Sequence, residues 1–190
     1  MIQSFLREKG IPELKGSDQI IRLAHAVSTI PWGEARTIDE VLTKNIGTCT
    51  GKHLVLQACF DELGIEFQPV VCTFRWGEQG IRFPTHLQEI LDEGEWAHGH
   101  NFVQIRGGTG EWIDLDITWD PPLEPYGFSA LSGNWDGQTS FVGLRSVDNR
   151  WDGISIAEKK SELIDSLSPK LKERHERFLK EFTQWIDSLR

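Results

Sequence analysis

One cysteine of this sequence stands where a cysteine can act as a nucleophile. Cys49 follows Gly47 and Thr48 in the stretch NIGTCTGKHLVLQACFDELGI and directly precedes a predicted helix over residues 50–63. At a helix N-terminus, unpaired backbone N–H groups and the helix dipole favour negative charge and lower the pKa of a thiol. The same N–H groups can stabilise an oxyanion. We therefore interpret Cys49 as a candidate nucleophile.

The candidate base and its partner come from two later stretches that alternate like strands. His100 opens HNFVQIR, and Asp116 lies in WIDLDIT. An imidazole can take the thiol proton, and a carboxylate beside it holds the tautomer and stabilises the imidazolium. His98 and Asp114, each two positions away on the same strand face, are the competing base and acid.

The hairpin between these two strands decides whether His100 and Asp116 meet. Side chains alternate between the faces of a sheet, so the numbers of facing residues must have an even sum for these two to share a face. Pairing Arg106 with Gly110 places the two opposite each other. It leaves a three-residue loop, residues 107–109 (GGT), a common hairpin length to which glycine is suited. We therefore predict a loop of odd length.

The same side chains have a second interpretation as a divalent-metal site. His98, His100, Asp114 and Asp116 would bring nitrogen and oxygen ligands together from adjacent strands. No His or Cys ligand pattern on a helix accompanies them. We rank this interpretation below the nucleophile, and we expect no metal and no other cofactor.

Three further residues are candidates for lining the site. Trp32, in IPWGEAR, has an indole N–H that could donate to the oxyanion, and packing at a helix exit is the alternative. Thr48 directly precedes the nucleophile, and His53 lies on the polar stripe of the predicted helix, where it lines the site or meets solvent. Cys59 and Cys72 are interpreted as buried packing residues.

Helical patterns surround these residues. Apolar positions recur with helical spacing over 18–30, and Thr37 with Glu40 makes a capping box for a short helix over 38–44. The helix over 50–63 is apolar around most of its circumference, which is typical of a helix buried in the centre of a domain.

The remaining elements are a strand, a long loop and a helical end. EFQPVVCTFRW has a strand pattern in which Pro69 indicates an edge position or a bulge. The Pro- and Gly-rich stretch 120–138 is long enough for a functional loop, and two short strands are possible around 141–147. Residues 157–167 and 169–189 are predicted to form a helical pair that contributes core and no chemistry.

Composition limits the classes to which the protein can belong. A hydrophobic fraction of 38% and a formal charge of −9 indicate a globular chain. The acidic balance, without a block of Lys or Arg, argues against nucleic-acid binding. No apolar run approaches the roughly 20 residues that span a bilayer, and no secretion signal is recognisable at the start. We expect a single cytoplasmic domain over 1–190, with its core at about 17–150 and C-terminal helices at about 155–189.

Three motifs together resemble the transglutaminase-like branch of the papain-like cysteine fold. They are a cysteine at the start of a buried helix ending in ELGI, a strand opening HNFVQI, and a strand ending WIDLDITW, and they cover roughly residues 45–120. The resemblance implies an α+β fold in which a central helix packs on an antiparallel sheet. It also implies Cys49 as nucleophile, His100 as base and Asp116 as orienting acid.

The resemblance implies cysteine-dependent acyl transfer or hydrolysis at an amide bond through a thioester intermediate. Hydrolysis is favoured, because the chain lacks the extra domains of large cross-linking enzymes, and calcium regulation is not implied. The expected partner is a protein, peptide or small amide substrate, and the oligomeric state stays open. The alternative is a non-catalytic module of the same fold that binds peptides or serves as a scaffold.

Overall fold

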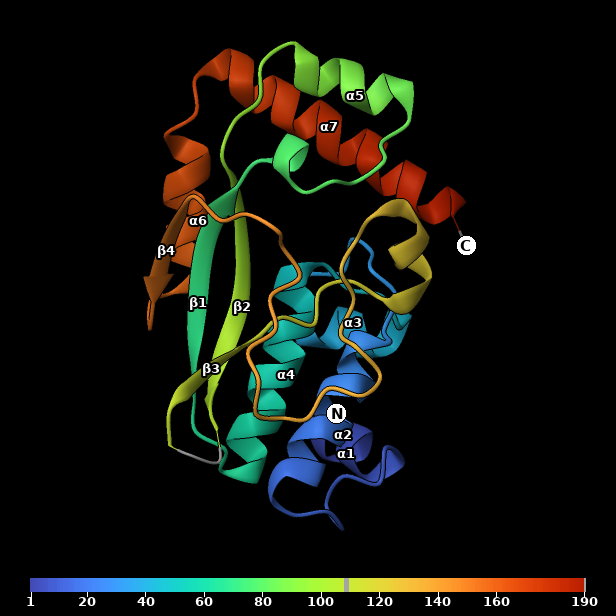
Figure 1. The fold of residues 1–190 in the computed structure, drawn as a ribbon, viewed down its shortest axis with the longest axis vertical. Coiled ribbons are helices and arrows are strands. Elements are labelled where there is room, and N and C mark those ends of the chain that lie inside the picture. The colour runs from blue at the N-terminus through green and yellow to red at the C-terminus, as the bar shows by residue number, and fades with distance from the viewer. Residues whose placement is uncertain (108–109, 190) are drawn as a thin grey trace.

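The computed structural model describes residues 1–107 and 110–189 and has an α+β fold (Figure 1). Its described strands form one four-stranded antiparallel sheet with the order β3-β2-β1-β4. The strands are β1 (Phe67–Phe74), β2 (His98–Arg106), β3 (Trp112–Leu115) and β4 (Asn149–Asp152). The α+β class expected from the sequence is therefore confirmed.

Helices surround this sheet at both of its ends. α4 lies along the sheet with α1, α2 and α3 beside it, while α5 and α7 pack together at the opposite end (Figure 1). The α-helices are α1 (Ile2–Glu8), α2 (Gly16–Ser28), α3 (Ile38–Lys44), α4 (Cys49–Leu63), α5 (Thr85–Asp92), α6 (Ile156–Asp165) and α7 (Pro169–Ser188). Two 3-10 helices, η1 (Trp76–Glu78) and η2 (Pro121–Tyr126), lie in the connections. None of the helices in the described ranges is both long and apolar enough to cross a bilayer.

The central helix α4 ends where its sequence predicts and begins one residue earlier, at Cys49. The side chain of Thr48 accepts a hydrogen bond from the N–H of Gly51 and caps the first turn. Gly64 ends the helix in the left-handed region, with φ of 67°, which glycine adopts without strain. Val55, Leu56, Cys59 and Phe60 are fully buried in the core that α4 shares with α1, α2 and the sheet. The predicted central helix is confirmed, and Cys49 is its first residue.

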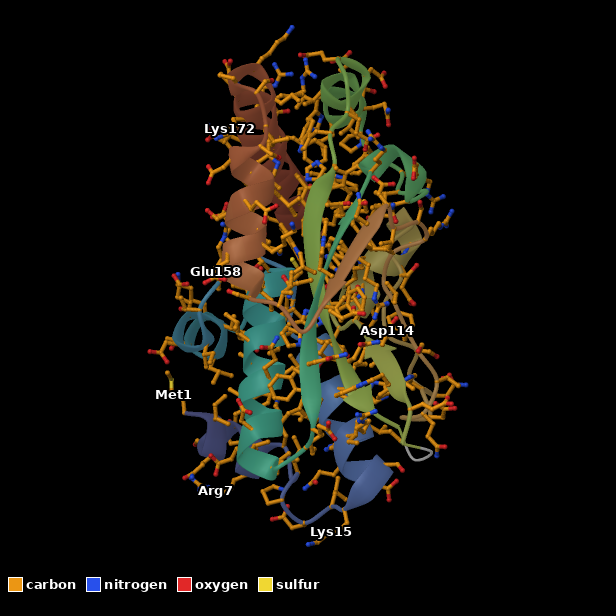
Figure 2. All side chains as sticks on the ribbon, turned by 90° about the vertical axis from the view of Figure 1, so that its left-hand side faces the viewer. Met1, Arg7, Lys15, Asp114, Glu158 and Lys172 are labelled. Atoms are coloured by element: carbon orange, nitrogen blue, oxygen red, sulfur yellow. The ribbon has the colours of Figure 1, made fainter. Side chains whose placement is uncertain are left out.

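α6 lies on the same side of the sheet as α4. Figure 2 shows the two helices stacked one above the other, with Glu158 of α6 near the level at which α4 begins. Gly99 of β2 permits this packing, because a Cβ there would lie 3.3 Å from the Leu163 side chain. The C-terminal helices therefore cover the sheet next to the N-terminus of α4.

The β2–β3 hairpin has the predicted parity but not the predicted register. Arg106 pairs with Trp112, not with Gly110, and the N–H of Gly107 donates to the Glu111 carbonyl at 2.8 Å. The shift by two residues keeps an odd-length connection, and side chains therefore keep their faces. Gly108 and Thr109 of the predicted loop lie outside the described residues.

Pro69 lies in an interior strand, so the prediction of an edge strand is wrong. β1 pairs with β2 on one side and β4 on the other. The β4 ladder begins only at Val70, and the carbonyl of Pro69 accepts from the Gly153 N–H beyond its end. The missing N–H of Pro69 faces this side, where the β4 ladder has already ended.

The region 120–147 differs from its prediction in two ways. Its described residues include no strand over 141–147: Phe141 makes only an isolated bridge to Leu115. The strand on that edge is β4, which the sequence did not indicate. The loop 120–138 contains η2 and buries Leu123, Phe128 and Trp135. It is therefore a packed part of the core.

Candidate active site

His100 and Asp116 form a buried pair beside the N-terminus of α4. The distance from His100 Nε2 to Asp116 Oδ2 is 2.7 Å. Both side chains are almost completely buried, and hydrogen bonding links His100 to the Cys49 thiol. Because Nε2 is bonded to Asp116, Nδ1 is the nitrogen left for proton exchange with Cys49. The structure thus brings together the three residues predicted from the sequence.

Backbone groups hold the carboxylate of Asp116 in place. Its Oδ1 accepts from the N–H of Thr118 at 3.0 Å, and its Oδ2 accepts from the N–H of Gly143 at 3.0 Å. Burial would raise the pKa of this carboxyl, but the charge and hydrogen bond of His100 outweigh it and hold the pKa well below its usual range. Asp116 is therefore an anion that orients His100.

The pKa values of Cys49 and His100 move in opposite directions. Burial would raise the pKa of the Cys49 thiol, but the Lys160 ammonium and the hydrogen bond with His100 outweigh it and lower the pKa to about 5. Burial would lower the pKa of His100, but the Asp116 carboxylate and the Cys49 thiolate raise it to about 9. Between these values the two residues form a thiolate–imidazolium pair.

Lys160 of α6 is a site residue that the sequence analysis missed. Its Nζ donates to Cys49 Sγ at 3.3 Å, to Thr50 Oγ1 at 2.9 Å and to Asn101 Oδ1 at 2.6 Å. In the sequence, Lys160 is one charge in AEKKSE, a pattern typical of a solvated helix face. No local signal distinguishes it from Lys159.

His53 and Lys52 of α4 join the nucleophile to the segment after β3 that carries the acid. The Nδ1–H of His53 donates to the Cys49 carbonyl at 2.7 Å, and its Nε2 accepts from the N–H of Ile117 at 3.2 Å. Burial lowers the pKa of His53 to about 4, so the ring is neutral. Lys52 Nζ donates to the Thr118 carbonyl at 2.9 Å. His53 thus lies behind the triad and does not meet solvent.

A cavity of about 450 Å³ opens on Cys49 and His100. Trp32, Thr48 and Thr50 line it on the side of α4. The helices α6 and α7 also line it, through Lys160, Leu163, Ile164, His175, Glu176, Leu179, Lys180, Phe182 and Thr183. The prediction that the C-terminal helices contribute only core is wrong. None of residues 120–138 lines the cavity.

Trp32 and Thr48, two of the residues predicted to line the site, both line the cavity. The Trp32 ring packs against Trp119 and Phe182, and its backbone N–H donates to Asp120 at 2.7 Å. The Thr48 side chain accepts a hydrogen bond from the N–H of Gly51, and the Thr48 carbonyl accepts one from the N–H of Lys52. The N–H groups of Cys49 and Thr50 are the others of this first turn. Donation by the Trp32 indole to an oxyanion stays a prediction.

His98 and Asp114 do not join the catalytic pair. Asp114 lies on the side of the sheet away from α4 (Figure 2), where it binds Arg150 through two contacts of 2.7 Å. His98 packs against Trp96 and His175. Within the described ranges, no group of three or more His, Cys, Asp and Glu side chains is arranged to hold a metal ion. The four-residue metal site is therefore not formed.

The other two cysteines are buried packing residues, as predicted. Neither Cys59 nor Cys72 has exposed surface. Burial raises the pKa of Cys59 to about 12 and also raises the pKa of Cys72. Their thiols stay protonated at neutral pH, in contrast to Cys49.

Comparisons with known proteins leave the family open. A scan against protein-family models matches no family, and a search of the curated proteins finds no match. The transglutaminase-like family therefore stays a prediction that depends on the three motifs and on how their residues are arranged.

Proposed function

We propose that this protein is a cysteine-dependent acyl-transfer enzyme with a transglutaminase-like core, and that it hydrolyses an amide bond through a thioester. The observation that carries the proposal is the contact of Cys49 with His100, which is itself bonded to Asp116 at 2.7 Å. A nucleophile at a helix N-terminus, a base and an orienting carboxylate are the three roles that this chemistry needs.

In the first half of the reaction, the thiolate of Cys49 attacks the carbonyl carbon of the amide. The electron pair of the C=O bond moves to oxygen, and the N–H groups of Cys49 and Thr50 at the positive end of α4 stabilise that charge. As the tetrahedral intermediate collapses, the C–N bond breaks and the imidazolium of His100 gives its Nδ1 proton to the leaving amine. The products are a thioester on Cys49 and a free amine.

In the second half, neutral His100 takes a proton from water, and the resulting hydroxide attacks the thioester carbonyl. The C–S bond breaks, the acid leaves, and the thiolate–imidazolium pair is restored. Asp116 keeps its charge throughout and stabilises the imidazolium. An amine in place of water would give transamidation by the same steps.

The alternative of a non-catalytic binding module is separated from this proposal by trapping the intermediate. The full chain is incubated with a panel of small aryl and alkyl amides and activated esters, and intact-mass spectrometry follows acylation. The expected result is one acyl group on Cys49, absent in Cys49→Ala, and slower to form in His100→Ala. Cys59→Ala is the matched control and keeps the adduct. Absence of acylation from every compound, with Cys49 titrating as an ordinary thiol, would leave only the binding module.

A further inference from the structure

Cys49 and Lys160 bring a thiol and a primary amine together from two different helices. The nitrogen of Lys160, in α6, donates to the sulfur of Cys49, at the start of α4, over 3.3 Å. Both side chains line the cavity and are partly exposed. An amine this close to a sulfur can do more than stabilise a thiolate, because an oxidised sulfur is open to attack by nitrogen.

The amine is held in this position by oxygen atoms of two neighbouring side chains. Lys160 Nζ donates to Asn101 Oδ1 at 2.6 Å and to Thr50 Oγ1 at 2.9 Å. Asn101 of β2 is fully buried, and its Oδ1 also accepts from the Thr50 hydroxyl at 2.9 Å. The nitrogen is therefore kept beside the sulfur. The rotatable stem of the lysine lets it close the remaining gap without a change of the backbone.

Of the three cysteines, Cys49 is the one that an oxidant is expected to reach. Oxidation selects for thiolate character and exposure. Cys49 has both, because it lines the cavity and its pKa is lowered to about 5. Cys59 and Cys72 have no exposed surface, and burial raises the pKa of both. A cavity of about 450 Å³ admits a molecule as small as hydrogen peroxide.

We propose that Cys49 and Lys160 form a reversible sulfur–nitrogen cross-link, a sulfenamide, when the protein meets hydrogen peroxide. The cross-link joins α4 to α6 and protects the sulfur from irreversible oxidation. It also blocks the sulfur as a nucleophile. Only this last consequence rests on the proposed function, since the cross-link itself needs no catalysis.

The chemistry takes two steps and one molecule of peroxide. In the first step, the thiolate attacks an oxygen of the peroxide, the O–O bond breaks, and a sulfenic acid and a hydroxide ion form. The hydroxide takes a proton from the Lys160 ammonium and becomes water. In the second step, the neutral amine attacks the sulfur, the S–O bond breaks, and the oxygen leaves as a second water with a proton from the nitrogen. The sulfur loses two electrons, the peroxide gains two, and the thiolate–ammonium pair becomes a neutral S–NH bond.

The experiment treats the full chain with hydrogen peroxide and follows its intact mass, then maps tryptic peptides without reduction. A loss of about 2 Da is expected. Peptides 45–52 and 160–170 should be joined, because trypsin does not cleave after a cross-linked lysine. Dithiothreitol should separate them, because a thiol reduces the sulfur–nitrogen bond. A disulfide gives a different map, since Cys59 and Cys72 both lie in peptide 53–75.

Lys160→Arg separates the amine from its charge. A guanidinium keeps a cation beside the thiolate but stays protonated and does not attack sulfur. Cys49 in this variant is expected to gain about 16 and then about 32 Da, and the second product is not reversed by dithiothreitol. After a dose of peroxide that consumes the free thiol, dithiothreitol should recover at least about fivefold more Cys49 thiol from the unaltered chain than from Lys160→Arg.

Lys159→Arg is the matched control. Lys159 bonds to Glu162 and stacks on Trp151, away from the cysteine. This variant is expected to cross-link as the unaltered chain does, with the same recovery of thiol.

Four results would overturn the proposal. They are no reaction with peroxide, a gain of oxygen by Cys49 without a cross-link, a loss of about 2 Da that maps to other peptides, and an equal loss in Lys160→Arg. Failure of the proposed function looks different. A chain that cross-links but is acylated by no amide or ester keeps this proposal and loses the enzyme, whereas a chain that is acylated on Cys49 but does not cross-link shows the reverse.

Discussion

The amine of Lys160 lies 3.3 Å from the sulfur of Cys49, although the two residues are 111 positions apart in the sequence. Two further oxygens, from Thr50 and Asn101, hold the amine at the N-terminus of α4. The thiolate thus faces two cationic groups, the ammonium and the imidazolium of His100. This arrangement makes α6 part of the site.

Replacing Lys160 is expected to change the charge state of the nucleophile. Lys160→Met removes the ammonium and keeps an aliphatic chain, so the pKa of Cys49 should rise from about 5. The acid limb of Cys49 alkylation by iodoacetamide would then move to higher pH. Lys159→Met is the matched control, because Lys159 stacks on Trp151 and not on the cysteine. An unchanged acid limb in Lys160→Met would show that the Lys160 ammonium does not lower the pKa of Cys49.

The pKa values of Cys49 and His100 predict the pH dependence of the unaltered protein. A thiolate requires a pH above about 5, and an imidazolium requires a pH below about 9. Alkylation of Cys49 should therefore increase as the pH rises through about 5, well below the ordinary thiol value of about 8.5. Turnover of a cleaved amide should fall again as the pH rises through about 9, because His100 can no longer protonate the leaving amine.

Peptide-level mass spectrometry separates Cys49 from Cys59 and Cys72, whose raised pKa values predict no labelling in the folded chain. Labelling of Cys49 only above about pH 8 would disprove the ion pair.

Asp116→Asn keeps the shape of the side chain and removes its charge. The imidazolium of His100 then loses its counter-ion, so the pKa of His100 should fall and that of Cys49 should rise. A loss of about 10²–10⁴-fold in kcat/KM is expected for a residue in this role. Asp114→Asn is the matched control two residues earlier in the chain, because Asp114 binds Arg150 away from the site. Equal kinetics for the two variants would show that Asp116 orients nothing.

His53→Leu tests the link between α4 and the Asp116 segment. The change leaves the Ile117 N–H without its partner in a buried place, while the Cys49 carbonyl keeps its helical bond to the backbone N–H of residue 53. One such group costs about 1–3 kcal/mol, so a loss of about that size in the free energy of unfolding is expected from urea denaturation. Gln57→Leu, one turn further along α4, removes an amide nitrogen that lacks a partner among the described residues and should change stability by less than about 1 kcal/mol. The role of His53 is contradicted if both variants cost the same.

Gly51→Ala tests how closely the first turn of α4 must approach the preceding loop. A Cβ at this position would lie 2.4 Å from the Ala35 carbonyl oxygen, a backbone atom that cannot rotate away. Overpacking of this kind costs about 1–3 kcal/mol. Gly133→Ala is the matched control, since a Cβ there meets nothing within 4 Å. Thermal unfolding that shifts equally in both variants would show that the close contact is unimportant.

The sequence by itself determined the local geometry of the site. Thr48 and Gly64 fix the ends of α4, because capping and left-handed backbone are properties of a few neighbouring residues. Alternation of side chains along two predicted strands places His100 and Asp116 on the same face of the sheet. The observed register differs from the predicted one by two residues, and an even shift leaves the faces unchanged. Cys49, His100 and Asp116 were therefore predictable as one group.

Only the tertiary structure decided what surrounds that group. The position of α6 depends on packing between segments that are far apart in the chain, and nothing local marks Lys160 as the lysine that reaches the cysteine. In the sequence, His53 is one polar position of a stripe. Only the fold buries it and brings its Nε2 to the Ile117 N–H, from which it accepts a hydrogen bond. Local patterns record what each segment prefers, whereas contact and burial are properties of the assembled fold.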